Sequence, residues 1–234
     1  MAGEGSRKPS SIMSIWRRNY SKLLAEAIGT YVLVFAGCGA IVIDQVSRGQ
    51  VTHVGVALSF GLAVGTMIAG LGHISGAHFN PAVTLALTVR GHFPIKWVLP
   101  YWVAQAGGAM LAALMLSGLF GANTGLGRTV PAGSDVQSFG LEVILTAILV
   151  FVIAAMALDK RVIPTFAAPA IGGTVALEAL FAGPISGASM NPARSLAPAV
   201  VSGQFDHLLI YLTAPFLGGL IGIALFHALS SATG

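Results

Sequence analysis

The sequence predicts an all-α membrane protein with six transmembrane helices and two re-entrant half-helices, arranged as an inverted repeat. Three observations support this fold class: an apolar composition, six long apolar runs, and two short segments that share the tripeptide Asn-Pro-Ala. Of the 234 residues, 55% are hydrophobic and 9% are charged, and the mean hydropathy is +0.84. Soluble domains carry about 25% charged residues, so most of this chain is expected to lie in a lipid bilayer.

Six apolar runs are long enough to cross about 30 Å of hydrocarbon at about 1.5 Å per helical residue. They cover approximately Leu23–Ile43, Val54–Leu71, Trp97–Phe120, Phe139–Leu158, Val162–Phe181 and Leu208–Leu229. The connection between the third and fourth runs is Gly-rich and polar, so it is expected to be a surface loop. The chain then divides into a cytoplasmic tail (1–20), a first repeat (21–120), a connecting loop (121–136) and a second repeat (137–234).

The basic residues predict the orientation of the chain. With the N-terminus inside, nine of the twelve Lys and Arg residues lie on the cytoplasmic side, as the positive-inside rule expects. These nine are Arg7, Lys8, Arg17, Arg18, Lys22, Arg90, Lys96, Lys160 and Arg161; the others are Arg48, Arg128 and Arg194. Both termini are therefore expected in the cytoplasm, with the chain in the cell membrane (plasma or inner membrane). Because the charges are scattered at the ends of apolar runs, no nucleic-acid partner is expected.

Two further segments, after the second and fifth runs, are too short to span the membrane. Each begins with Asn-Pro-Ala, at Asn80, Pro81 and Ala82 and at Asn191, Pro192 and Ala193. Asn is favoured as a helix N-cap, and Pro is favoured at the first helical position, where its missing N–H costs nothing. Segments 80–90 and 191–200 would each be about 15 Å long, or half a bilayer. Each therefore predicts a re-entrant half-helix.

The same segments belong to an internal repeat. Ser-Gly-Ala precedes Asn-Pro-Ala in both, and the offset from Asn80 to Asn191 is 111 residues. The first run of each half carries Glu and Thr four residues apart, as Glu26 and Thr30 and as Glu142 and Thr146. Because three spans per repeat is an odd number, the second copy enters the membrane upside down, and the half-helices meet N-terminus to N-terminus near the midplane. Glu26 and Glu142 are expected to brace loops rather than to contact a solute.

The stretches that precede the half-helices predict a pore, because irregular backbone in a membrane survives only in protein or beside water. The sequence predicts extended backbone over Gly76–Phe79 and Gly187–Met190. Its carbonyl groups would form a ladder of acceptors at Gly76, Ala77, His78, Gly187 and Ser189. At the centre, Asn80 and Asn191 would offer side-chain N–H donors, and two half-helix N-termini would repel cations.

These motifs resemble the major intrinsic protein (aquaporin) family. The resemblance rests on the doubled Asn-Pro-Ala boxes, the stretch Gly72–His78 before the first box and Arg194 after the second, and it covers nearly the whole chain beyond the tail. It implies a homotetramer in a lipid bilayer that passes water and small uncharged solutes. Exclusion of protons by helix dipoles and an arginine is known of aquaporin-type pores. The stretch Gly183–Met190 is most similar to the nodulin-like intrinsic proteins, which pass water, glycerol and small hydroxylated metalloids.

The resemblance also implies a selectivity filter made of Phe60, Ala179, Ala188 and Arg194. Strict water channels of the family have His where this chain has Ala179, so the ring here is expected to be wider and less polar. Ser195 resembles the water channels instead, and Phe60 stands where plant members often have Trp. The solute range therefore stays open between water, glycerol and neutral boric or arsenous acid.

The sequence thus predicts a passive channel for water and small neutral solutes that excludes ions and protons. An ion-coupled secondary transporter is the alternative, because such proteins also have inverted repeats and broken helices. It would need an ionisable coupling site at the midplane, for which Glu178 is the one unexplained candidate. A structural membrane protein that joins cells could reuse the fold, but the intact boxes argue against it. No nucleophile–base pair or metal-spaced cluster stands out, so neither an enzyme nor a metal or cofactor site is expected.

Overall fold

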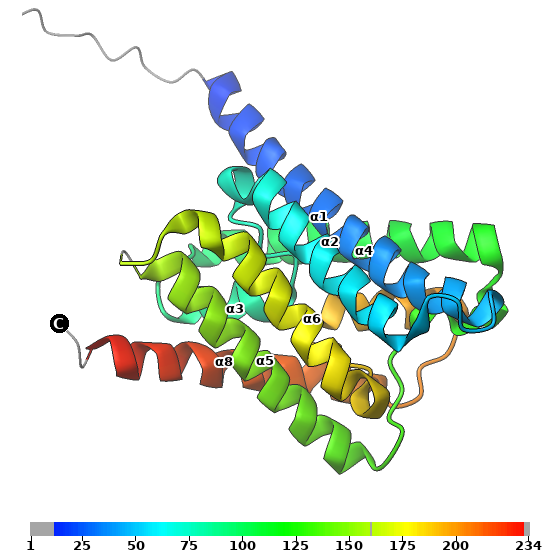
Figure 1. Ribbon diagram of the computed structural model, residues 1–234. Helices are drawn as coiled ribbons and strands as arrows, with labels where there is room; N and C mark the ends of the chain where they lie inside the picture. Colours follow the sequence, from blue (N-terminus) through cyan, green and yellow to red (C-terminus); the bar gives the residue numbers. More distant parts are fainter. Residues whose placement is uncertain (1–11, 160, 232–234) are drawn as a thin grey trace, which may run out of the picture.

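The computed structural model describes residues 12–159 and 161–231, and these residues form helices and connecting segments without a β-strand (Figure 1). The helices are α1 (Ile12–Val46), α2 (Thr52–Ser75), α3 (Pro81–Val89), α4 (Val98–Phe120), α5 (Asp135–Leu158), α6 (Ala167–Ser186), α7 (Pro192–Ser202) and α8 (Leu208–Ser231). Three short 3₁₀ helices connect them: η1 (Ile95–Trp97), η2 (Ala122–Gly127) and η3 (Pro164–Phe166).

The predicted spans are confirmed: six helices in the described part of the chain are long and apolar enough to cross a membrane. The two half-helices are also confirmed, since α3 has 9 residues and α7 has 11. Helix α1 begins at Ile12, so the second half of the expected tail (1–20) is continuous with the first span. Residues 1–11 of that tail lie outside the described residues, as does Lys160 from the set that predicts orientation.

The long helices cross closely where glycine removes the side chain. A Cβ atom added to Gly108 of α4 would lie 2.0 Å from the carbonyl oxygen of Ala27 in α1. In the second half, a Cβ added to Gly218 of α8 would lie 2.3 Å from the carbonyl oxygen of Val143 in α5. Small residues at crossings let membrane helices pack backbone to backbone. The α1–α4 and α5–α8 pairs are therefore built in the same way.

The inverted repeat is visible in side-chain contacts as well as in the helix order. The hydroxyl of Tyr101 in α4 donates to the carbonyl of Ser75 at 2.8 Å, where α2 ends. The hydroxyl of Tyr211 in α8 donates to the carbonyl of Ser186 at 2.7 Å, where α6 ends. Both tyrosines are buried. Each half thus uses its third long helix to hold the point where the chain leaves its second.

The connecting segment between the repeats differs from the expected surface loop. Leu126 of η2 is 0% exposed and Thr129 is 5% exposed, and η2 packs against α1, α4 and α7. Helix α5 begins at Asp135 with Ser134 as its N-cap, so the connection is also shorter than predicted. The prediction of a surface loop is therefore wrong for Leu126 and Thr129. Burying Leu126 removes apolar surface from water, and η2 packs against α7.

Candidate functional site

Each half-helix begins with an asparagine cap. Asn80 has extended backbone angles (φ −154°, ψ 123°), and its Oδ1 accepts from the backbone N–H of Ala82 at 2.9 Å. Asn191 is alike (φ −147°, ψ 108°), and its Oδ1 accepts from Ala193 N at 3.0 Å and Arg194 N at 3.3 Å. A proline occupies the first turn of both helices. Satisfying these N–H groups fixes which side-chain atom of each asparagine points at its own helix.

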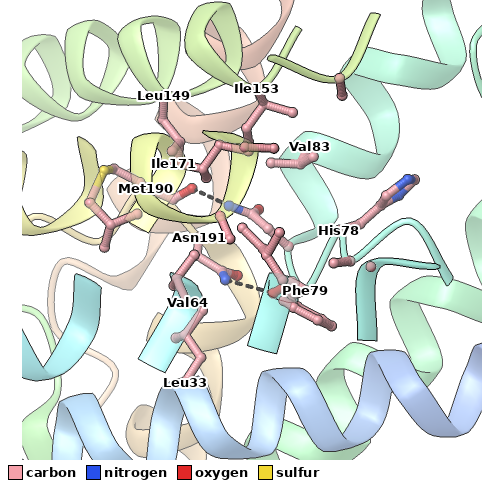
Figure 2. Close-up of a pocket in the computed structure, with 18 of the residues that line it drawn as sticks. Leu33, Val64, His78, Phe79, Val83, Leu149, Ile153, Ile171, Met190 and Asn191 are labelled. Atoms are coloured by element: carbon pink, nitrogen blue, oxygen red, sulfur yellow. Dashed lines mark hydrogen bonds between the residues drawn. The ribbon is translucent and has the colours of Figure 1, made fainter. Parts of the chain in front are cut away.

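The same two asparagines join the half-helices to each other. The Nδ2 atom of Asn80 donates to the carbonyl of Met190 at 2.7 Å, and that of Asn191 donates to the carbonyl of Phe79 at 2.9 Å. Figure 2 shows both bonds as dashed lines, with Asn191 directed at Phe79. An amide nitrogen has two hydrogens, so each asparagine retains one N–H for another acceptor. The amino ends of α3 and α7 therefore face each other across a short gap.

The backbone that precedes each half-helix is not extended, contrary to the sequence prediction. In the first half, φ is +91° at Gly76, +52° at Ala77 and +52° at Phe79. In the second half, the equivalent residues repeat the pattern, with +84° at Gly187, +41° at Ala188 and +53° at Met190. A left-handed conformation costs about 1–2 kcal/mol for a residue other than glycine. Something must hold the four non-glycine residues in it.

Glu26 holds the first of these loops. Its Oε1 accepts from Ser75 Oγ at 2.7 Å and from His78 N at 3.0 Å, and its Oε2 accepts from Phe79 N at 2.7 Å. Gln105 of α4 also donates to Oε2, at 2.8 Å. The carboxyl group is completely buried. Its acceptors replace the helical hydrogen bonds that the loop backbone has lost.

Glu142 holds the second loop with the same geometry. Its Oε1 accepts from Ser186 Oγ and from Ser189 N, both at 2.8 Å, and its Oε2 accepts from Met190 N at 2.8 Å. Tyr101 of α4 and its counterpart Tyr211 of α8 are 110 residues apart, and the same offset places Pro215 where the first half has Gln105. The second carboxyl group therefore lacks the glutamine contact of the first. Glu142 is as fully buried as Glu26.

A cavity of about 680 Å³ runs past the point where the half-helices meet. Its polar lining includes Asn80 and Asn191 together with Gly76, Ala77, His78 and Ser189 of the two loops. Its apolar lining is supplied by the long helices, and it includes Leu33, Val64, Leu149, Ile153, Ile171 and Val175. Figure 2 shows Leu33 and Val64 on one side of Asn191, and Leu149, Ile153 and Ile171 on the other. The cavity therefore combines a few polar groups with mainly apolar walls.

Some predicted pore residues lie outside this lining. Gly187 was expected in the carbonyl ladder, but it does not line the cavity. It ends α6 as a left-handed cap, and a Cβ added there would lie 3.1 Å from Thr129 Cγ2. The backbone at this point is thus packed against the connecting segment. The Pro and Ala residues of both boxes also lie behind the lining, where they begin the half-helices: Pro81, Ala82, Pro192 and Ala193.

The four residues expected in the selectivity filter all line the cavity. The guanidinium carbon of Arg194 lies 4.8 Å from the ring centroid of Phe60, within range of a cation–π interaction. Its Nη1 donates to the carbonyl of Gly127 at 2.7 Å. Arg194 is only 1% exposed, so it does not extend to the surface, and Ala179 and Ala188 line the same cavity.

The Gly127 carbonyl is a site residue that the sequence analysis missed, because the connecting segment was expected at the surface. Thr84 of α3 and Gln105 of α4 are two further residues of the site that were not predicted. Gln105 Nε2 donates to Thr84 Oγ1 at 3.0 Å as well as to Glu26, and His78 Nδ1 lies 3.1 Å from the same hydroxyl. A polar residue in the middle of an apolar run was the one pattern that could have indicated Gln105.

Glu178 does not contribute to the cavity. It lies in α6 beside Ala179 and is 1% exposed, and it is not among the lining residues. Neither of its carboxyl oxygens has a hydrogen-bond partner within the described ranges. The coupling site of an ion-driven transporter needs an ionisable group that the permeating ion can reach. Among the described residues that line the cavity there is no Asp or Glu to serve as one.

Comparisons with known proteins agree with this arrangement. The family model described as "Major intrinsic protein" matches residues 13–227. Aquaporin NIP1-1 of Oryza sativa subsp. japonica is 52% identical over 202 residues, which cover 86% of this chain and 71% of the relative. Nodulin-26 of Glycine max is 46% identical over 202 residues, which cover 86% of this chain and 74% of the relative.

A solved structure has the same fold. The aquaglyceroporin from Plasmodium falciparum aligns with a TM-score of 0.84 at 24% sequence identity, and the alignment covers 92% of this chain and 98% of that chain. At this sequence identity the match shows a shared fold. The family model and the relatives together cover almost the whole described helix bundle, and on that basis the chain is a member of the major intrinsic protein family.

Proposed function

We propose that this protein is a passive channel for water and small neutral solutes, among them glycerol and neutral boric or arsenous acid. One observation carries the proposal: the reciprocal bonds from Asn80 to Met190 and from Asn191 to Phe79, which hold two half-helix amino ends at one point of a continuous cavity. The relatives named aquaporins support the same class of function.

The centre of the cavity would orient a neutral solute and repel a cation. Each half-helix amino end carries about half a positive charge, and the two ends add at the midpoint. The remaining N–H groups of Asn80 and Asn191 donate to the oxygen of a passing molecule. Carbonyl groups of the flanking loops accept its hydrogens before and after that point. A hydroxylated molecule therefore keeps its hydrogen bonds, whereas a cation loses its hydration in a positive field.

The second barrier in this proposal is the ring of Phe60, Ala179, Ala188 and Arg194. The buried Arg194 guanidinium adds a fixed positive charge to the cavity wall. Two alanines opposite it present only methyl groups, which leaves room for molecules larger than water. Phe60 supplies an apolar face against which the carbon atoms of glycerol can lie. Pore diameter and lining, rather than specific binding, would set the solute range.

A panel of fluxes in proteoliposomes tests this function. Purified protein is reconstituted, and stopped-flow light scattering follows water, glycerol, urea and boric acid in separate runs, with protein-free vesicles as the control. We expect flux that is linear in the solute gradient and unchanged by a protonophore. Accumulation of any of these solutes against its gradient would instead establish the transporter alternative.

The assembly and the orientation belong to the same proposal. We propose a homotetramer in the cell membrane with both termini in the cytoplasm, and two repeats (21–120 and 137–234) joined by the segment 121–136. Large apolar side chains on the outside of the long helices support a lipid or subunit environment, for example Leu62, Leu99 and Leu209. Among the described basic residues, Arg90, Lys96 and Arg161 lie at or between helix ends that this orientation would place on the inner side, and Lys22 lies near the start of the first apolar span.

A further inference from the structure

Two histidines that lie far apart in the sequence meet at one end of the helix bundle. The Nε2 atom of His92 lies 3.1 Å from the Nε2 atom of His227. The ring centroids are 5.2 Å apart and the ring planes differ by 13°. His92 follows α3 and His227 lies in the last turns of α8, so 135 residues separate the two. Nothing in the proposed channel mechanism uses this pair.

The separation of the two nitrogens suits a shared transition-metal ion. With metal–nitrogen bonds of about 2.0–2.1 Å, two ligands of a tetrahedral zinc ion stand about 3.3 Å apart. Two neighbouring ligands of a square-planar copper or nickel ion stand about 2.9 Å apart. The observed 3.1 Å lies between these values. We propose that His92 and His227 form a binding site for a divalent transition-metal ion of the kind that imidazole prefers (Zn²⁺, Ni²⁺ or Cu²⁺), with water as the remaining ligands.

Both ligands are held in place by packed elements. The backbone N–H of His92 donates to the carbonyl of Leu87 at 2.9 Å, which fixes His92 to the last turn of α3. Leu87 belongs to a buried cluster with Ile223 and Phe226 of α8, directly before His227. Helices α3 and α8 pack side by side (Figure 1). A site whose ligands are already positioned loses little conformational entropy when the ion binds.

The surroundings also allow an ion to enter. His92 is exposed and His227 is partly exposed, so water can reach the space between the two rings. Arg90 lies close enough for its charge to act on His227, which weakens the binding of any cation. Neutral imidazole is the form that binds metal. The two ring nitrogens would supply the protein ligands.

Metal-dependent stability of the purified chain tests the site. The protein is prepared without a polyhistidine tag, and its apparent unfolding temperature in detergent is measured at pH 7.5 with Zn²⁺, Ni²⁺ or Mg²⁺. At about ten times the dissociation constant, a bound ion should raise the apparent unfolding temperature by about 3–5 °C. Zn²⁺ or Ni²⁺ should give this rise and Mg²⁺ should not.

Three variants assign the effect to this pair. His92→Asn and His227→Asn should each abolish the rise relative to their own metal-free protein. The matched control is His207→Asn, because His207 Nδ1 contacts a different group, Asp135 Oδ1, at 2.7 Å; it should keep the full rise. If an Asn variant does not fold, the Gln variant at the same position replaces it.

A spectroscopic readout does not depend on folding energy. Electron paramagnetic resonance of the Cu²⁺-loaded protein should show coupling to two ring nitrogens, and to one or none in His92→Asn. A rise that persists in both Asn variants, a rise that disappears in His207→Asn, or a spectrum without two coupled nitrogens would overturn the proposal.

Discussion

Replacing Glu142 by Gln should disable the channel, whereas the same change at Glu178 should have almost no effect. Both side chains are buried acids on neighbouring helices, and Gln keeps the size and shape of each. They differ in their partners. The Glu142 carboxyl group accepts from Ser186 Oγ, Ser189 N and Met190 N, whereas neither oxygen of Glu178 has a partner in the described part of the chain.

The expected cost at Glu142 follows from these bonds. An amide offers one oxygen, so even in the better orientation the N–H of Met190 faces an NH₂ group. A buried donor without an acceptor costs about 1–3 kcal/mol. The other two bonds lose their charged acceptor, and with it about 1 kcal/mol each. The sum of about 3–5 kcal/mol is comparable with the strain that Ala188 and Met190 carry at φ +41° and +53°.

The loop should therefore relax away from its observed conformation. The carbonyl of Met190 would no longer be aimed at Asn80 Nδ2, and the central donors would lose their orientation. We expect Glu142→Gln to reduce water flux at least about tenfold per inserted protein and to lower the apparent unfolding temperature by about 6–20 °C. Glu178→Gln loses no hydrogen bond, so its flux should stay within about twofold of the parent and its unfolding temperature within about 2 °C.

Stopped-flow shrinkage of proteoliposomes, normalised to protein quantified by immunoblot, measures the flux of each variant. Differential scanning fluorimetry in detergent measures stability. Parental flux in Glu142→Gln, or an equal loss in the two variants, would show that the carboxyl hydrogen bonds do not set the loop conformation.

Other predictions concern the lining of the cavity. Arg194→Ala should raise proton leak in vesicles loaded with a pH-sensitive dye; at an effective dielectric constant of about 20, a unit charge about 6 Å away contributes about 3 kcal/mol, so the rise should not exceed about 100-fold. An unchanged proton leak in Arg194→Ala would show that Arg194 does not contribute to the barrier against protons. Ala179→His should depress glycerol flux more than water flux, because it narrows the ring, and an equal loss of both would contradict the filter assignment. Mercurials should inhibit weakly, because Cys38 is completely buried and lies outside the cavity lining; strong inhibition that Cys38→Ser relieves would contradict this.

The helices and their caps could be predicted because the information for them is local. A run of about 20 apolar residues is sufficient to indicate a span. The dipeptide Asn-Pro, at Asn80 and again at Asn191, is sufficient to indicate where a helix begins. The duplicated glutamates indicated the inverted repeat for the same reason, since each stands at a fixed distance from its threonine.

The loop conformation and the buried connecting segment could not be predicted, because they depend on partners far away in the chain. Of the residues with positive φ before the half-helices, only Gly76 and Gly187 suggest that conformation by their type. Ala77 and Phe79 adopt this conformation because it turns the N–H groups of His78 and Phe79 toward Glu26. The Glu26 carboxyl group, about 50 residues earlier in the chain, accepts from both. Leu126 packs in a buried cluster with residues of α1, α4 and α7, and the Gly127 carbonyl accepts from Arg194, 67 residues later.

The repeat is symmetric where it holds the loops and asymmetric where it lines the cavity. Three residues after Asn191 comes Arg194, and three residues after Asn80 comes Val83; both line the cavity. Glu26 accepts a hydrogen bond from Gln105, whereas the second half has Pro215 at the equivalent position and no such donor. Only the second half has an arginine after its box, and this Arg194 donates to the carbonyl of Gly127. Under the proposed function, the shared framework places two equivalent amino ends at the centre, and a cation meets the same central field from either side. Only from the Arg194 side does it meet a full charge before that point. Because equivalent carboxyl hydrogen bonds hold the two loops, exchanging the two residues, with Val83→Arg and Arg194→Val in one chain, should move the outer barrier to the other mouth.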